Sequence, residues 1–352
     1  MKVGVLTFHR CINYGSYWQA RCLVEGLRRR GLEAVLLDHR SAAVDRAEWS
    51  CALRPLRPAR SSRADIAAYS RKARSFLRAV EALPRSAPFA LDAPDLVDSY
   101  DLVVIGSDEV WNLSHPWYGG RALFFGQGVK AARRISYAAS VGGYEPAAGL
   151  PACWTELLRG LDRLSVRDEN SRRLVSETVG VEPNIVLDPC LAFPPRVRPQ
   201  GQGSEPYVLV YGHDFPAGFG AAARAWAVRR GLRLVSVGYR NDWADEQRLS
   251  DGPEAFAAAM AGASAVATNF FHGCVFALLN AKPFACTTMP YRASKVRALL
   301  SAIGQESRLV ADGEATSAAF AAAVERPHDT AVDERLARLR RGSEGFLDAA
   351  IA

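Results

Sequence analysis

The residue best suited to acid–base chemistry is His272, which stands where a buried strand meets a helix. Residues 265–267 are apolar, Thr268 and Asn269 suit a strand end, and apolar residues recur with helical spacing after Gly273. The N–H groups and dipole of that helix start favour an anion, and the glycine lets a ligand approach the backbone. The alternative is a buried core histidine in an ordinary strand–helix–strand unit.

A second polar group of residues follows the strand predicted at residues 102–105. Ser107, Asp108, Trp111 and Asn112 come directly after that strand. A carboxylate and a hydroxyl can bond sugar hydroxyls, and an indole can stack on a sugar ring, so this spacing suits a saccharide. A capped helix start with a tryptophan in the core explains the same residues equally well.

Two further strand ends carry polar residues. Asn13, Tyr14 and Gly15 follow the first predicted strand, residues 3–8, and Arg167 follows a short strand. Ligands of open α/β sheets gather at the carboxyl ends of the strands, so these residues are expected near a ligand.

The guanidinium of Arg167 is suited to gripping a phosphate or a carboxylate with two parallel hydrogen bonds. A salt bridge with the neighbouring Asp168 or Glu169 is the structural alternative.

Strands and helices alternate in both halves of the 352-residue chain, which predicts an α/β fold with parallel sheets. A Pro- and Gly-rich stretch at 189–206 suggests a linker. We expect an N-terminal domain over 1–192, a C-terminal domain over 193–330 and a charged C-terminal helix over 331–352. Such a two-domain enzyme places its site in the cleft between the domains.

One predicted helix is strongly basic. Residues 66–83 include Arg71, Lys72, Arg74 and Arg78. Such charge usually forms a solvated helix face, and binding to a membrane surface is the alternative.

The net charge of +7 favours an anionic ligand or a loose association with an anionic membrane surface. No nucleic-acid-binding signature accompanies this charge, so nucleic acid is not expected as a partner. The sequence has no apolar run of 18 residues and no signal-peptide pattern at its start, which predicts a cytoplasmic protein with at most peripheral membrane association.

The seven cysteines are dispersed and show no zinc spacing, so free thiols and no metal site are expected. Cys274, beside His272, could serve as a nucleophile. A small apolar residue in the first helical turn is the simpler interpretation.

Taken together, the motifs resemble those of the polysaccharide pyruvyltransferase family over nearly the whole chain. The resemblance rests on six segments in order: Asn13-Tyr14-Gly15 with Gln19, Gly106-Ser107-Asp108-x-x-Trp111-Asn112, Tyr137 to Ser140, Ser165 to Asp168, Asp188-Pro189, and Phe271-His272-Gly273 with Lys282-Pro283-Phe284.

The resemblance implies two Rossmann-like domains in a GT-B-like arrangement, with the active site in the interdomain cleft. It implies transfer of the enolpyruvyl carbons of phosphoenolpyruvate to two hydroxyls of a sugar, forming a ketal and releasing phosphate. Phosphoenolpyruvate is then a co-substrate, and no cofactor or metal is required. A lipid-linked saccharide, a polysaccharide repeat and a small metabolite all remain open as the acceptor.

The resemblance also assigns residues. Arg167 and His272 would be catalytic and, with Gly273 and Lys295, would bind the donor. The family's Tyr-Asp-x-Lys segment corresponds here to Tyr291 to Lys295, which is one residue longer and lacks the Asp. Arg292 is therefore an alternative to Lys295. The acceptor would contact residues of the N-terminal half, namely Asn13, Tyr14, Gly15, Ser107, Asp108, Trp111 and Asn112.

Two other functions are compatible with the sequence. A glycosyltransferase using a nucleotide sugar would need a carboxylate for the ribose in the C-terminal half, and Glu254 is the obvious candidate. A non-catalytic carbohydrate-binding or scaffold protein is the other alternative.

Overall fold

The computed structural model describes residues 1–352 except 57–60, 95–97, 146–148, 198–204, 290–292, 312, 314 and 328. The chain divides into two compact units. Unit 1 consists of Met1–Glu48, Val80–Pro195 and Leu336–Ala352, and unit 2 consists of Trp49–Ala79 and Arg196–Arg335. The division at Pro195 lies close to the expected boundary at 192. The assignment of Trp49–Ala79 to unit 2 and of the chain end to unit 1 was not anticipated.

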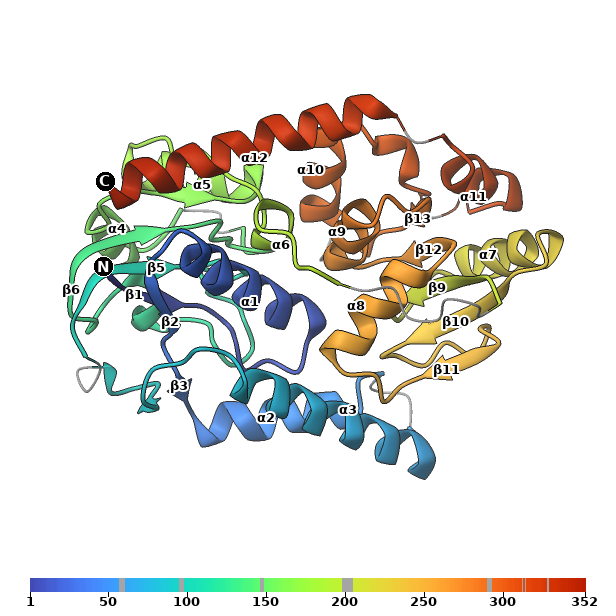
Figure 1. The fold of residues 1–352 in the computed structure, drawn as a ribbon, viewed down its shortest axis with the longest axis horizontal. Helices are drawn as coiled ribbons and strands as arrows, with labels where there is room; N and C mark the ends of the chain where they lie inside the picture. Colours follow the sequence, from blue (N-terminus) through green and yellow to red (C-terminus); the bar gives the residue numbers. More distant parts are fainter. Residues whose placement is uncertain are drawn as a thin grey trace. The chain divides into compact units, whose positions relative to one another are not determined.

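Unit 1 is built on a four-stranded parallel sheet with the strand order β2-β1-β5-β6 (Figure 1). These strands are β1 (Lys2–Leu6), β2 (Glu33–Leu36), β5 (Tyr100–Ile105) and β6 (Ala131–Ser136). Two short parallel ladders add to it, β3 (His39–Arg40) with β4 (Phe89–Ala90) and β7 (Ser165–Val166) with β8 (Asn184–Ile185). Because the ladders are parallel, polar residues that follow the strands collect at one edge.

The helices of unit 1 connect these strands, as the alternating pattern predicts. They are α1 (Tyr14–Arg29), α4 (Ala152–Arg159), α5 (Glu169–Val179), α6 (Pro189–Ala192) and the 3-10 helix η2 (Ala122–Phe125). Three of the four boundaries between the units fall within helices, namely α2 (Ala42–Leu53), α3 (Arg63–Glu81) and α12 (Thr330–Ile351), and the fourth follows Pro195. The predicted linker at 189–206 begins with α6, because Asp188 caps that helix and Pro189 fits its first position.

Unit 2 has a five-stranded parallel sheet with the order β11-β10-β9-β12-β13. Its strands are β9 (Tyr207–Tyr211), β10 (Arg233–Val237), β11 (Glu246–Arg248), β12 (Ala265–Thr268) and β13 (Phe284–Cys286). Strands β9 and β12 are buried on both faces, which is why they consist of continuous apolar runs without alternation.

The helices of unit 2 include the four predicted between residues 218 and 303, with three more that were not predicted for this domain. They are α3, α7 (Ala217–Arg229), α8 (Pro253–Gly262), α9 (Phe271–Leu279), α10 (Ala293–Ile303), α11 (Ser317–Val324) and the 3-10 helix η4 (Glu306–Arg308). Among the described residues, no helix combines the length and the hydrophobicity that crossing a bilayer requires.

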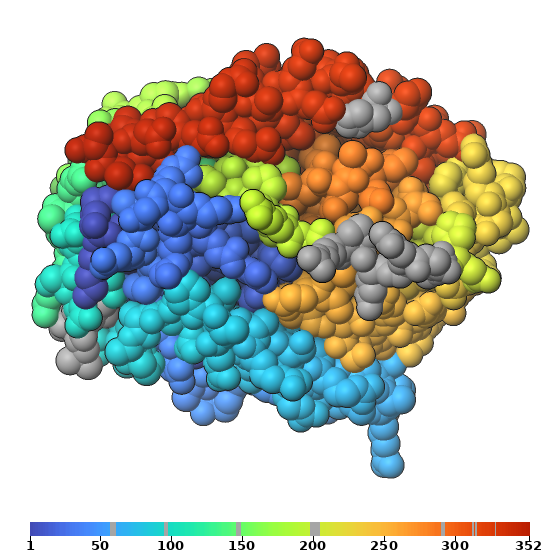
Figure 2. Space-filling view, viewed as in Figure 1, coloured from blue at the N-terminus to red at the C-terminus, as the bar shows by residue number. Residues whose placement is uncertain are grey.

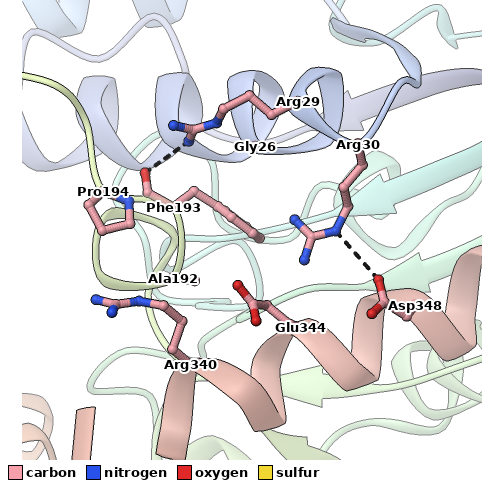
Figure 3. A pocket seen from close by; sticks show the side chains of 9 residues that line it. All are labelled: Gly26, Arg29, Arg30, Ala192, Phe193, Pro194, Arg340, Glu344 and Asp348. Carbon is pink, nitrogen blue, oxygen red and sulfur yellow. Dashed lines mark hydrogen bonds and ion pairs between the residues drawn. The ribbon is translucent and has the colours of Figure 1, made fainter. Parts of the chain in front are cut away.

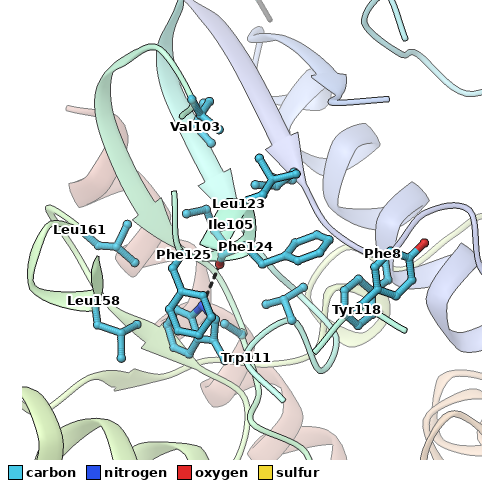
Figure 4. Packing of buried hydrophobic residues seen from close by; sticks show 14 of the residues in the cluster. Phe8, Val103, Ile105, Trp111, Tyr118, Leu123, Phe124, Phe125, Leu158 and Leu161 are labelled. Carbon is cyan, nitrogen blue, oxygen red and sulfur yellow. Dashed lines mark hydrogen bonds between the residues drawn. The ribbon is translucent and has the colours of Figure 1, made fainter. Parts of the chain in front are cut away.

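An aromatic core supports the loops of unit 1 from within (Figure 4). Phe8 stacks on Tyr118 with ring centroids 4.4 Å apart. Trp111 stacks on Phe125 at 6.0 Å and donates its indole N–H to the carbonyl of Phe124 at 3.0 Å. Burying each such ring stabilises the fold by about 1.5–3 kcal/mol, so the loops that follow β1 and β5 are firmly anchored.

The predicted basic helix is α3, but one of its charges is not on a solvated face. Arg71 and Arg74 are exposed, and one side of α3 forms part of the molecular surface in Figure 2. Lys72 is only 2% exposed and donates from Nζ to the carbonyl of Gly238 at 2.8 Å. Helical periodicity places Lys72 on the face opposite the two arginines, toward the interior of unit 2.

Candidate functional site

The first polar loop of unit 1 is organised by the cap of α1. The side-chain oxygen of Asn13 accepts from the backbone N–H groups of Gly15 at 2.8 Å and Ser16 at 3.3 Å. Asn13 is exposed, whereas Tyr14 is 1% exposed and packs in the interior. The loop therefore presents the asparagine and the start of α1, while the tyrosine serves packing.

The turn after β5 is bonded to this loop. Ser16 donates its hydroxyl to Oδ2 of Asp108 at 2.7 Å, and Thr7 donates to the carbonyl of Ser107 at 2.8 Å. Asp108 has a φ of 74°, a left-handed conformation that aspartate tolerates better than most residues. Two segments about ninety residues apart in the sequence thus meet at the carboxyl edge of the sheet.

Other residues of the predicted acceptor set are buried. Trp111 lies in the core at 1% exposure, so the core alternative is the observed one and its ring offers no sugar platform in this conformation. Asn112 is 2% exposed and donates from Nδ2 to Oε2 of Glu109 at 2.9 Å, and Ser107 is fully buried. The carboxylate of Asp108, 14% exposed, is the accessible polar group of this turn.

Arg167 follows β7 and joins the same network. Its guanidinium donates to Oδ1 of Asp108 at 3.5 Å and to Oδ2 of Asp188 at 3.3 Å, and its side chain is 2% exposed. Burial alone lowers the pKa of Arg167, but the charges of Asp108 and Asp188 raise it overall, so this residue stays a cation. Its ion pairs thus reach two acids distant in sequence.

The neighbour Asp168 has a capping role. Its Oδ1 accepts from the backbone N–H of Ser171 at 2.8 Å, and its Oδ2 accepts from the hydroxyl of Ser140 at 2.6 Å. The Tyr137-to-Ser140 and Ser165-to-Asp168 segments are therefore joined at the start of α5.

In unit 2, His272 lies within the first turn of α9 and is partly buried. The helix starts two residues earlier than the sequence pattern indicates, so this histidine is helical. Thr268 organises the turn: its hydroxyl donates to the carbonyl of Tyr211 at 2.6 Å and accepts from the N–H of Phe270 at 3.1 Å. The histidine is consequently held at the carboxyl end of β12.

Gly273 is required by packing in this turn. A Cβ at this position would lie 2.0 Å from the hydroxyl oxygen of Thr268. The group that approaches this glycine closely is therefore the Thr268 side chain of the same turn.

Three other residues of the C-terminal half were predicted as donor-binding or nucleophilic groups. Lys295 is partly buried in the first turn of α10, whereas Arg292 lies outside the described residues. Cys274 is fully buried, so the apolar alternative describes it.

Sequence reasoning gave no site role to two titratable side chains at this edge of unit 2. His213 follows β9 and bonds Asp214, with Nδ1 2.6 Å from Oδ2. Lys72 lies behind the turn after β10, and burial lowers its pKa to about 7. The strand-end rule that selects His272 also selects His213, whereas nothing in the local sequence distinguishes Lys72 from its basic neighbours.

A pocket of about 530 Å³ in unit 1 is lined by residues of α1, α6 and α12, among them Arg29 and Arg340 (Figure 3). It lies at the opposite end of α1 from Asn13. At 1.5 Å per residue, the 16-residue helix separates them by about 24 Å. Arg29 donates to the carbonyl of Phe193 at 3.3 Å and Arg340 donates to that of Leu191 at 3.0 Å. These arginines tie α1, α6 and α12 together, so we assign the pocket a structural origin.

Comparisons with known proteins place this geometry in context. The family described as polysaccharide pyruvyl transferase matches residues 13–288, more than three quarters of the chain. No curated protein sequence matches.

Solved structures share the fold. UDP-GlcNAc 2-epimerase from Neisseria meningitidis bound to UDP-GlcNAc is 12% identical with a TM-score of 0.54, covering 100% of both chains. S. aureus MnaA with UDP is 14% identical with a TM-score of 0.51, covering 98% of this chain and 94% of that one.

These similarities define the class of protein first: the chain has the GT-B fold that it shares with UDP-GlcNAc 2-epimerases, α/β with parallel sheets, as predicted. The extent of the family match then shows that the chain belongs to the polysaccharide pyruvyl transferase family. Membership indicates a transferase and implies a saccharide acceptor.

Proposed function

We propose that this protein transfers the enolpyruvyl carbons of phosphoenolpyruvate to two hydroxyls of a saccharide, forming a pyruvate ketal and releasing phosphate. The observation that carries the proposal is the family match over residues 13–288, within which the motif residues follow the strands of two parallel sheets. We propose that the reaction takes place in the cytoplasm, with no cofactor and no resident metal.

The donor carries a phosphate and a carboxylate, so it requires cations and N–H donors. His272 in the first turn of α9 lies where the helix dipole favours an anion. Arg167 is a buried cation whose bonds of 3.3 and 3.5 Å are at the long limit for hydrogen bonds. A phosphate, which makes shorter charge-assisted bonds, competes well for that guanidinium.

The chemistry then assigns roles. Protonation of the methylene carbon creates an oxocarbenium-like centre, and a sugar hydroxyl attacks it. His272 exchanges these protons, since an imidazole ring can both donate and accept a proton. Arg167, with Lys295 or Arg292, neutralises the departing phosphate. Gly273 keeps the turn beside the donor compact.

The acceptor interacts with residues of unit 1. Asn13 and the Asp108 carboxylate are the accessible polar groups there, and both accept hydrogen bonds from hydroxyls. Tyr14, Gly15, Ser107, Trp111 and Asn112 act by shaping this edge. The acceptor could be lipid-linked or free.

The test begins with the donor. Phosphoenolpyruvate should raise the melting temperature of the pure protein more than UDP-sugars do at equal concentration. Phosphate release should then depend on a saccharide with a vicinal or 1,3-diol, and a ketal should be detected by mass spectrometry. His272→Ala should abolish phosphate release, while Arg159→Gln, an exposed residue on α4, should leave it unchanged.

Two outcomes would redirect the assignment. Protection by UDP-sugars alone would favour a GT-B glycosyltransferase, whose ribose would require a carboxylate such as Glu254 in the first turn of α8. Saccharide binding with no phosphate release from any donor would favour a non-catalytic carbohydrate-binding protein.

A further inference from the structure

We propose that His213, oriented by Asp214, is a second acid–base group of unit 2 that works in addition to His272. The inference rests on the proposed pyruvyl transfer and deepens it.

The position of His213 follows from the sheet register. Tyr211, the last residue of β9, pairs with Thr268, the last residue of β12. Adjacent strands are about 4.8 Å apart, so His213 emerges beside the segment that leads to His272. The ring centroids of His213 and Phe270 are 5.3 Å apart, which confirms that the two strand ends are neighbours.

The backbone around His213 is unusual and firmly held. Gly212 has a φ of 148° and Asp214 a φ of 55°, both conformations that most side chains disfavour. Asn241 donates to the carbonyl of Gly212 at 2.9 Å, and Asn269 donates to that of His213 at 2.7 Å. These asparagines are 6% and 0% exposed. The two buried asparagine side chains thus hold the loop that carries His213 in one conformation.

The imidazole itself is oriented for proton exchange. Its Nδ1 lies 2.6 Å from Oδ2 of Asp214, an arrangement that holds a proton on Nδ1 and makes Nε2 the nitrogen that accepts one. The ring of Tyr239 lies 4.9 Å away and packs against it. The His213 side chain is 16% exposed, so it is sheltered but reachable.

A buried cation supports that packing. Nζ of Lys72 lies 4.7 Å from the centroid of the Tyr239 ring and donates to the carbonyl of Gly238. Lys72 is therefore a positioning residue for the wall of the His213 site.

The proposed reaction needs more than one proton exchange. One proton enters the methylene carbon of the donor, and two protons leave the acceptor hydroxyls. Protonated His272 gives its proton to the methylene, while neutral His213 takes the proton of the first hydroxyl as its oxygen bonds the central carbon. The bond from that carbon to the phosphate oxygen then breaks with its electron pair on the oxygen, and His213 gives that oxygen its proton. The second hydroxyl bonds the carbon as the phosphate leaves and returns a proton to His272.

The experiment compares His213→Ala, Asp214→Asn and the control Asp242→Asn, whose carboxylate is 85% exposed in the same unit. Phosphate release from phosphoenolpyruvate is measured with a panel of methyl glycosides carrying diols. We expect kcat to fall about 100-fold or more for His213→Ala with KM for the donor changed less than threefold. Added imidazole should raise the kcat of His213→Ala at least tenfold, a rescue that would not occur if His213 had only a structural role. The kcat of Asp214→Asn should fall about tenfold, and that of the control Asp242→Asn should not change.

A second measurement needs no turnover. Nitrogen NMR of histidine-labelled protein should show the proton of His213 on Nδ1, and Asp214→Asn should change that tautomer. Observation of the proton on Nε2 in the wild-type protein would overturn the inference.

The outcomes separate the two proposals. Absence of donor protection and of phosphate release in the wild-type protein overturns the proposed function and this inference with it. Wild-type turnover with an unchanged kcat in His213→Ala overturns the inference alone. If His213→Ala does not fold, Asp214→Asn decides, because that carboxylate is 59% exposed and its loss leaves the core intact.

Discussion

The buried ammonium of Lys72 should make the stability of the protein depend on alkaline pH. The side chain is 2% exposed, and burial lowers its pKa from 10.5 to about 7. The unfolded chain keeps this proton up to about pH 10.5, whereas the folded chain releases it near pH 7. Between these values unfolding takes up a proton, so a rise in pH stabilises the folded state.

The size of the effect follows from the shift. One pKa unit corresponds to about 1.4 kcal/mol, so the full difference approaches about 5 kcal/mol. Most of this change in the free energy of unfolding takes place above pH 7, and about 2 kcal/mol of it should appear between pH 7 and pH 9. Below about pH 6 the group is protonated in both states and contributes no pH dependence.

Replacement of Lys72 with Met should remove this dependence. The variant loses one hydrogen bond to the carbonyl of Gly238, which costs about 1–3 kcal/mol, but no longer buries an amine. At pH 6 we therefore expect Lys72→Met to be about 2–4 kcal/mol more stable than the wild-type protein, which is the difference between these two contributions. That advantage should shrink by about 2 kcal/mol between pH 7 and pH 9.

Urea unfolding followed by tryptophan fluorescence, at half-unit steps from pH 5.5 to 9, measures the difference between the two proteins. Arg74→Met is the matched control, because Arg74 is exposed on the same helix and should give curves parallel to the wild type. Parallel curves for Lys72→Met and the wild-type protein would refute the reasoning, since they would mean that the ammonium is solvated.

Three further predictions concern single side chains. Asn13→Ala should lower the free energy of unfolding by about 1 kcal/mol because it removes the α1 cap. Asn13→Asp should keep most of the cap's contribution to stability, and urea unfolding measures both variants. Gly273→Ala should lower the melting temperature because its Cβ would meet the Thr268 hydroxyl, whereas Gly342→Ala, in open space on α12, should add about 0.5–1 kcal/mol. Arg167→Met should cost about 3–5 kcal/mol by leaving the buried carboxylate of Asp188 and the partly buried carboxylate of Asp108 uncompensated, and an unfolding energy within 1 kcal/mol of wild type would contradict this network.

The periodicity of the sequence predicts the elements of this fold well. Strand β9 and helix α7 lie within one residue of the predicted 207–211 and 218–230, because continuous apolar runs and amphipathic stretches differ in period. The start of α9 was misplaced, since Phe271 and His272 precede the first residue with a clear helical pattern. The grouping of Trp49–Ala79 with unit 2 depends on contacts of α3, such as Lys72 with Gly238, that local pattern does not contain.

Side-chain roles were harder to predict than positions. Trp111 lies three residues after Asp108, yet the tryptophan points into the core and the aspartate reaches the sheet edge. Spacing alone allowed both orientations, and burial against Phe125 decides between them. Lys72 and Arg74 differ in the same way. Lys72 lies on the face of α3 that packs against the rest of unit 2, and Arg74 lies on the exposed face.

The motifs gain their meaning from the bonds between them. Ser16 bonds Asp108, Asp108 bonds Arg167, and Arg167 bonds Asp188, so residues from four separate segments form one network at the strand ends of unit 1. The charges of Asp108, Arg167 and Asp188 offset part of one another's burial penalties, and the Ser16 hydroxyl adds a hydrogen bond to Asp108. These shared interactions make the network, more than any single residue, the unit on which substitutions in this half of the protein should act.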